Sequence, residues 1–235
     1  METISESSPE PAELVLAAVE AKEVTKEFGA GPTAVTALYS ASVRFDKGDF
    51  CAIIGPSGSW KSSLLHCLCG IEPVTSGEVL IGDTALSALS ERDLTLLRRD
   101  RIGFVFQSFN LIPVLTAREN ITVPLRLARR KPDPEWFDRV IDTLDLRERL
   151  HHRPAELSGG QQQRVAVARS LMNKPEIVFA DEPTGNLDSG TSGEIMALLN
   201  RMHRARGLTM IIVTHNRELA ASLDRILQIE DGCLA

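Results

Sequence analysis

No apolar stretch in the 235 residues approaches the roughly 18 consecutive positions that indicate a membrane span. The first eleven residues are acidic and polar, whereas a secretory signal has a basic start and an apolar middle. Basic residues are not gathered into one segment and the formal net charge is −6, which argues against nucleic acid as the main partner. We therefore expect a protein that is kept inside the cell and that, if it serves a membrane, does so as a peripheral subunit.

Cysteine offers little for metal binding. The four cysteines include Cys67 and Cys69, which follow His66, but no second pair of ligands stands at a zinc spacing elsewhere. Cys67 and Cys69 are two residues apart in a predicted helix and so point in different directions. We interpret these cysteines as small, buried, apolar side chains.

The apolar content of 43% is enough for one domain with a full core. Residues 1–16 are rich in Ser, Glu and Pro and predict a mobile tail. Alternation predicts strands at residues 19–28 and 34–45, and short apolar runs predict buried strands at 50–54, 102–106, 177–180, 210–213 and 225–229. Helical patterns cover residues 90–99, 159–172 and 192–206, and also 116–150 with breaks at Pro124 and around 131–134.

Strands that alternate with helices predict an α/β fold with a mostly parallel sheet covered on both faces. Residues 107–158 are mostly helical and stand outside this alternation. We expect them to form an inserted α-helical subdomain.

The turn after the strand at 50–54 has the pattern of a phosphate-binding loop, G-x-x-x-x-G-K-[ST], at all but one position. In such a loop, backbone N–H groups at the start of a helix point into one concavity, and the helix dipole adds positive potential. Lys61 supplies a cation for the outer phosphates and Ser62 a hydroxyl for Mg²⁺. The candidate cofactor-binding residues are Gly55, Pro56, Ser57, Gly58, Ser59, Trp60, Lys61, Ser62 and Ser63.

Two acids, Asp181 and Glu182, end the buried strand at 177–180. Parallel sheets place ligands at the carboxyl ends of their strands, so we expect both acids to face the loop. Asp181 would hold Mg²⁺ through its water shell, and Glu182 would orient and deprotonate an attacking water. An Asp-Glu pair alone is a weak signal, but it gains weight beside a phosphate loop.

A second helix start follows Leu157, where the sequence is Ser158-Gly159-Gly160-Gln161. Ser158 is a predicted cap, and the two glycines let the backbone approach an anion. The segment could be nothing more than a helix N-terminus. However, one subunit does not need two phosphate-binding helix starts for one nucleotide, so a neighbouring subunit can use the second.

These motifs together resemble the nucleotide-binding domain of ABC ATPases, from about residue 19 to the C-terminus. The resemblance rests on Leu157–Gln161 followed by Asp181-Glu182-Pro183-Thr184. It implies a P-loop NTPase (RecA-like) core at residues 17–235 with an antiparallel β subdomain. It also implies ATP and Mg²⁺ as cofactors, and a dimer in which two chains close head to tail around two ATP molecules.

The resemblance also assigns further roles. Gln107 would contact Mg²⁺ and the attacking water, and His215 would reach the terminal phosphate as the switch histidine. Asp188 lies in the loop that communicates across the dimer. Phe28 stands where the family stacks an aromatic ring on adenine. Ser158 and Gly160 of one chain would cover the terminal phosphate bound by the other.

Residues 33–38 and 101–112 resemble the macrolide-exporter and lipoprotein-release type of ABC ATPase. That resemblance implies a partner permease with few membrane helices and a large extracytoplasmic domain, and a place for this chain on the cytoplasmic face of the membrane. Residues 107–115 would lie near the permease. The apolar residues there could make that contact or could pack the helical subdomain; they are Phe109, Leu111, Ile112 and Leu115.

Trp60 is the one residue that does not fit the loop pattern, because it replaces the second glycine. An indole is too large to lie beside a phosphate. It either swings out and leaves a strained backbone, or fills part of the nucleotide site. In both cases we expect weaker ATP binding.

Two other functions stay open. A soluble ABC ATPase acting on nucleic acid or ribosomes typically carries a long coiled-coil insertion or two cassettes, whereas here 50 residues (157 − 107) separate Gln107 from Leu157 and there is one cassette. A non-hydrolysing interaction module is the second alternative, with Trp60 as its mark.

Overall fold

Two β-sheets organise the chain, whose computed structural model describes residues 17–234. The tail expected at residues 1–16 therefore lies outside the described part. The smaller sheet is antiparallel, with the strand order β2-β1-β4-β5. Its strands are β1 (Ala17–Phe28), β2 (Val35–Asp46), β4 (Ser76–Ile81) and β5 (Thr84–Ala85).

The larger sheet has the strand order β10-β9-β3-β8-β7-β6. All its neighbours pair in parallel except β10, which runs antiparallel to β9. Its strands are β3 (Phe50–Ile54), β6 (Ile102–Val105), β7 (Ile177–Asp181), β8 (Thr209–Val213), β9 (Arg225–Glu230) and β10 (Cys233–Leu234). The expected mostly parallel sheet is confirmed.

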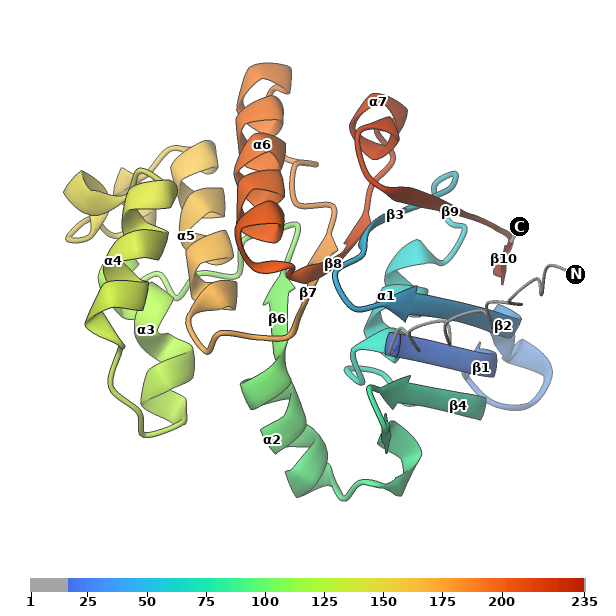
Figure 1. Ribbon diagram of the computed structural model, residues 1–235. Coiled ribbons are helices and arrows are strands. Elements are labelled where there is room, and N and C mark those ends of the chain that lie inside the picture. The colour runs from blue at the N-terminus through green and yellow to red at the C-terminus, as the bar shows by residue number, and fades with distance from the viewer. Residues whose placement is uncertain (1–16, 235) are drawn as a thin grey trace, which may run out of the picture.

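Seven α-helices lie in the described part of the chain. They are α1 (Lys61–Leu68), α2 (Glu91–Arg101), α3 (Ala117–Leu127), α4 (Pro134–Thr143), α5 (Gly159–Leu171), α6 (Ser189–Arg206) and α7 (Arg217–Ala221). Helices α3, α4 and α5 form a lobe on one side of the parallel sheet, and β1, β2 and β4 lie on the opposite side (Figure 1). We call the former the helical lobe. No helix within residues 17–234 is long and apolar enough to cross a membrane.

Each central strand of the parallel sheet contributes to two separate cores. In β7, Val178 and Ala180 pack into a cluster shared with the helical lobe, and Phe179 packs into a cluster shared with α1 and the antiparallel sheet. In β8, Ile212 packs into the first of these clusters and Ile211 into the second. Because side chains of a strand alternate between its faces, both faces of this sheet are apolar and covered.

Most of the predicted elements are present, with two corrections. Pro124 does not break α3, which runs through it. A proline inside a helix removes one N–H donor, but α3 buries Ala117, Ile121 and Leu125 on one face, which offsets that loss. Helix α6 begins at Ser189 rather than at residue 192, because Asp188 caps it by accepting a hydrogen bond from the Thr191 amide.

The buried state expected for the cysteines holds for Cys51, Cys67 and Cys69, while Cys233 is exposed. Burial raises the pKa of the Cys51 and Cys69 thiols to about 12 and that of Cys67 to about 11. These three side chains are therefore neutral, inert thiols at physiological pH.

Candidate nucleotide site

Residues 55–63, here called the phosphate loop, comprise the turn that follows β3 and the first three residues of α1. Gly55 is required by a close approach, because a Cβ there would lie 2.1 Å from the Ile229 carbonyl oxygen. Lys61 is 7% exposed, and its ammonium group donates hydrogen bonds to the carbonyl oxygens of Gly55 (3.0 Å) and Pro56 (2.7 Å). The loop thus folds around its own lysine and leaves Pro56, Ser57 and Gly58 exposed.

Trp60 holds the backbone conformation of a glycine. Its φ of 69° and ψ of 24° lie in the left-handed region, which costs a bulky L-residue about 1–3 kcal/mol. Its side chain leaves the loop and stacks on Phe28, with 5.9 Å between ring centroids and 23° between ring planes. The indole therefore swings out of the loop and the backbone is strained, which is the first of the two expected arrangements; the ring that it contacts is Phe28, the residue that the resemblance assigns to adenine.

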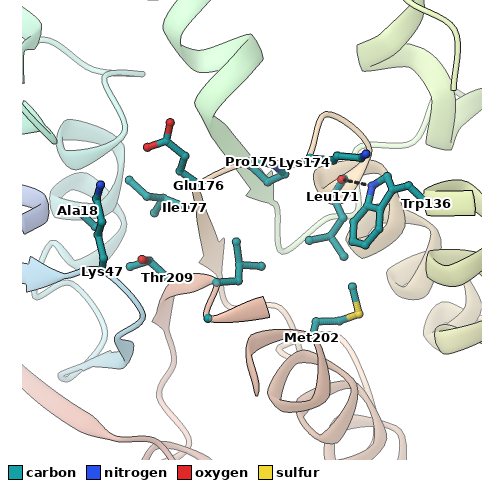
Figure 2. Close-up of a pocket in the computed structure, with 12 residues that line it drawn as sticks. Ala18, Lys47, Trp136, Leu171, Lys174, Pro175, Glu176, Ile177, Met202 and Thr209 are labelled. Atoms are coloured by element: carbon teal, nitrogen blue, oxygen red, sulfur yellow. Dashed lines mark hydrogen bonds between the residues drawn. The ribbon is translucent and has the colours of Figure 1, made fainter. Parts of the chain in front are cut away.

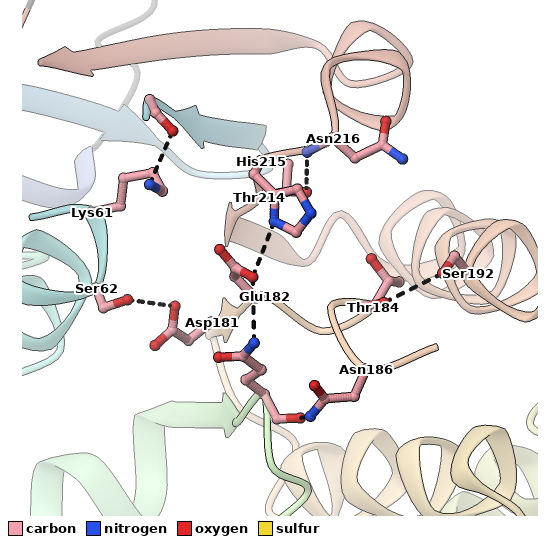
Figure 3. Close-up of polar contacts among 12 residues, drawn as sticks. Lys61, Ser62, Asp181, Glu182, Thr184, Asn186, Ser192, Thr214, His215 and Asn216 are labelled. Carbon is pink, nitrogen blue, oxygen red and sulfur yellow. Dashed lines mark hydrogen bonds and ion pairs between the residues drawn. The ribbon is translucent and has the colours of Figure 1, made fainter. Parts of the chain in front are cut away.

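Ser62 and Asp181 meet between α1 and β7. The Ser62 hydroxyl donates to Asp181 Oδ1 at 2.9 Å (Figure 3), and His66 Nε2 lies 3.9 Å from Asp181 Oδ2. Burial raises the pKa of the Asp181 carboxyl above its ordinary value, and the Ser62 hydrogen bond and His66 act in the opposite direction. Two oxygen donors thus stand together at the start of α1.

Glu182 is the meeting point of three segments that are far apart in sequence. Its Oε2 lies 3.1 Å from His215 Nδ1 and 3.5 Å from Gln107 Nε2. His215 follows β8 directly after Thr214, and its side chain is 64% exposed (Figure 3). The carboxyl ends of β6, β7 and β8 therefore bring Gln107, Glu182 and His215 together.

The loop after Glu182 is tied to the same cluster. Asn186 Nδ2 donates to the Gln107 carbonyl oxygen at 2.9 Å, and a Cβ on Gly185 would lie 3.0 Å from both Gln107 Nε2 and Glu182 Oε2. Asp188 closes this loop by capping α6, with Thr191 Oγ1 donating to its Oδ2 at 2.7 Å.

Ser158 caps α5 as the sequence predicts. Its hydroxyl accepts from the Gln161 amide (3.3 Å), and Gln161 Oε1 accepts from the Ser158 amide (3.0 Å). Ser158, Gly160 and Gln161 border an open hollow of about 230 Å³, together with acidic and basic residues of the helical lobe and α6. None of the residues that line this hollow comes from the phosphate loop.

A cavity of about 330 Å³ lies at the other end of the parallel strands, where β7 and β8 begin (Figure 2). Two of its charged groups are already engaged, since Lys174 pairs with Asp133 (2.6 Å) and Glu176 with Arg101 (2.9 Å). Trp136 closes one wall and donates its Nε1–H to the Leu171 carbonyl oxygen at 3.0 Å. This cavity is remote from the polar cluster at the carboxyl ends of the strands.

A phosphate loop between a parallel strand and a helix, with acids at the end of a second parallel strand, β7, which β8 separates from β3, defines the P-loop NTPase fold. Comparison of the chain with known proteins agrees with this fold assignment. Residues 38–185 match the ABC transporter family. The chain is 44% identical over 218 residues to the lipoprotein-releasing system ATP-binding protein LolD of Syntrophotalea carbinolica, covering 92% of this chain and 96% of that protein.

The macrolide export ATP-binding/permease protein MacB of Bdellovibrio bacteriovorus is 41% identical over 92% of this chain, which spans 33% of that longer protein. Among solved structures, a dimeric post-hydrolysis state of the ATP-binding cassette MJ0796 bound to ADP and Pi gives a TM-score of 0.84 at 41% identity. It covers 92% of this chain and 96% of that one; MJ0796 is from Methanocaldococcus jannaschii. The present chain belongs to the ABC transporter family and is an ATP-binding cassette of the MacB and LolD type.

Two residues of this cluster escape analysis of the sequence alone. His66 follows Ser62 by four residues, so both lie on one face of α1, and that spacing is the only signal that places His66 near Asp181. Asn186 belongs to the segment 185–188 that resembles the loop acting across the dimer, but no pattern predicts its contact with the Gln107 carbonyl, because that contact depends on the path of the loop.

The tight approach at Gly55 gives a test of the loop architecture. We expect Gly55→Ala to lower the free energy of unfolding by about 1–3 kcal/mol, because the new Cβ overlaps the Ile229 carbonyl. The matched control is Gly193→Ala inside α6, where a Cβ meets open space and alanine should stabilise by up to about 1 kcal/mol. Urea denaturation measures both, and equal changes in the two variants would contradict the geometry.

Proposed function

We propose that the chain binds and hydrolyses ATP as a dimer and thereby drives a separate membrane permease. The observation that carries the hydrolytic part is the position of the Glu182 carboxylate, in reach of both His215 and Gln107. The loop residues 55–63 would cradle the phosphates through their backbone amides. Lys61 would exchange its two loop carbonyl partners for phosphate oxygens.

The Ser62 hydroxyl and the Asp181 carboxylate are the oxygen donors that Mg²⁺ prefers, and Gln107 is the third candidate. Among residues 17–234, no cluster of three His, Cys, Asp or Glu side chains could hold a metal by itself. Ser62, Asp181 and Gln107 fit Mg²⁺ even though they are few, because this ion keeps several waters and takes further ligands from substrate phosphates. When bound, the ion would neutralise charge on the β- and γ-phosphate oxygens.

Glu182 is the proposed general base. Its carboxylate would accept a proton from the attacking water as the new O–P bond forms and the bond from the γ-phosphorus to the bridging oxygen breaks. Gln107 would help to hold the water, and His215 would orient Glu182 through its Nδ1 and present its exposed ring to the γ-phosphate.

We propose that the α5 start completes the site of a second copy. In the structure Ser158, Gly160 and Gln161 border a hollow that shares no residue with the phosphate loop. The start of α5, with Gly159 and Gly160 in its first turn, can therefore serve a nucleotide held elsewhere. Asp188 would lie in the loop between the two subunits. The dimeric state of the MJ0796 cassette supports this arrangement.

The permease partner follows from the relatives, whose names join an ATP-binding part to a permease or to a lipoprotein-releasing system. We propose that the chain sits peripherally at the cytoplasmic face of the membrane and that the permease carries an extracytoplasmic domain. Residues near 107–115 are the proposed contact. Ile112 is 41% and Val114 73% exposed, whereas Leu111 packs against the core of the helical lobe.

Glu182→Gln tests the hydrolytic proposal. Because the amide cannot accept the proton of water, we expect ATP turnover to fall by about 10²–10⁴-fold while ATP binding persists. Glu91→Gln, in the exposed first turn of α2, is the matched control and should leave turnover unchanged. Unaltered turnover in Glu182→Gln would remove Glu182 as the base. Absence of turnover in the unsubstituted chain and in Trp60→Gly would support the non-hydrolysing module.

Trp60 is proposed to weaken ATP binding in this chain. We expect Trp60→Gly to raise ATP affinity and turnover severalfold, because glycine adopts a positive φ without strain and leaves the ring of Phe28 free. Calorimetry and a phosphate-release assay measure the two quantities. Equal values in both proteins would show that Trp60 does not impair the site.

Affinity purification from solubilised membranes tests the partner class. We expect one membrane protein to co-purify with the chain, and to be lost when the exposed Ile112 and Val114 are replaced together by Asp. Leu127→Asp, 75% exposed on α3, is the comparison for a non-specific loss of apolar surface. Recovery of ribosomes or DNA without a membrane protein would instead favour the soluble alternative.

A further inference from the structure

The backbone conformation of Trp60 and the packing of its side chain hold the indole outside the phosphate loop. Its backbone has the left-handed conformation directly before the first residue of α1, so the loop keeps the path that a glycine would give it. The side chain is partly buried and packs against the apolar cluster between α1 and the antiparallel sheet. The Lys61 ammonium group keeps its hydrogen bonds to the carbonyl oxygens of Gly55 and Pro56, so the indole does not come between them.

The ring that receives the indole is fixed from β1. Phe28 is the last residue of that strand, and Lys26 Nζ lies 4.7 Å from its ring centroid. Lys26 is itself 8% exposed and donates to the Pro73 carbonyl oxygen at 2.8 Å. The Phe28 ring is therefore an anchored surface.

The two rings form an offset stack that leaves no space for a third ring. A base inserted between them would need about 3.5 Å on each side, or about 7 Å between the ring planes. The observed 5.9 Å between centroids, at an interplanar angle of 23°, is typical of a direct aromatic pair. A base could reach this face of Phe28 only after the indole had left it.

We propose that the Trp60 indole takes the place of the nucleobase on Phe28, so that the site recognises a triphosphate chain and not the base attached to it. This inference rests on the proposed function, in which the loop binds phosphates, and on the family resemblance, which implies that Phe28 is the base platform. The ligand class becomes any nucleoside triphosphate, together with inorganic tripolyphosphate. Trp60 is then a specificity-determining residue, because the phosphate contacts of Lys61 and Ser62 persist while base stacking is lost.

Calorimetric titration with ATP, GTP and tripolyphosphate, each with Mg²⁺, tests this in the full chain. The unsubstituted protein should bind the three ligands with affinities within about threefold of one another. Trp60→Ala removes the indole but keeps an L-residue at the positive φ, so it isolates stacking from backbone strain. We expect it to raise ATP affinity about 3- to 10-fold, the range of one aromatic contact, and to leave tripolyphosphate affinity unchanged.

Phe28→Ala in the Trp60→Ala background is the matched control and should cancel the gain for ATP. An unsubstituted protein that prefers ATP to tripolyphosphate as strongly as Trp60→Ala does would overturn the inference and leave the proposed function standing. Absence of Mg²⁺-dependent binding of all three ligands in every variant, Trp60→Gly included, would overturn both.

Tryptophan fluorescence supplies a second measurement. The chain has two tryptophans, so the difference between the unsubstituted protein and Trp60→Ala isolates the emission of Trp60 from that of Trp136. We expect ATP and tripolyphosphate to change this emission equally. A red shift with ATP and none with tripolyphosphate would show that the base displaces the indole, and would refute the inference.

Discussion

The parallel pairing of β6, β7, β8 and β3 is the constraint on which the candidate site depends. Val213 of β8 pairs with Asp181 of β7 on one side and with Ile53 of β3 on the other, so the carboxyl ends of these three strands are level with one another. Side chains from three separate segments then meet without any local sequence relation. Each residue of this cluster needs only to be the first or second after a buried strand, and the sheet supplies the proximity.

That constraint explains which predictions from sequence succeed. Short apolar runs identify the central strands because both faces of the sheet are covered, and the polar residues after them are then expected at one edge. The strand Ser76–Ile81 has no such run before Val79, and Gly77 weakens its signal, so its existence depends on pairing with β1. Pro124 wrongly predicts a break in α3, because the burial of one face of this helix outweighs the loss of one hydrogen bond.

The orientation of Trp60 could not be predicted from sequence. The motif shows that the residue does not fit, but its partner Phe28 is 32 residues away (60 − 28), at the end of β1 in the antiparallel sheet, and only the fold brings the two ring centroids to 5.9 Å. The strained backbone and the ring contact have opposite effects on stability. An aromatic pair contributes about 0.5–1.5 kcal/mol beyond the apolar area that it buries, comparable to the cost of a positive φ. The loop can therefore keep its path despite the substitution.

The helical lobe is coupled to the cluster through contacts that leave little room for independent movement. A Cβ on Gly160 would lie 2.5 Å from Thr191 Cγ2, so the start of α5 packs directly against the first turn of α6. Thr191 is in turn bound to Asp188, and Asn186 of the same loop holds the carbonyl of Gln107. In the proposed dimer, a displacement of the α5 start by a nucleotide of the partner would therefore reach Gln107 and Glu182 through short, directional contacts. The same chain of contacts would carry a displacement of residues 107–115 by a permease back to the α5 start, because coupling between two sites acts in both directions.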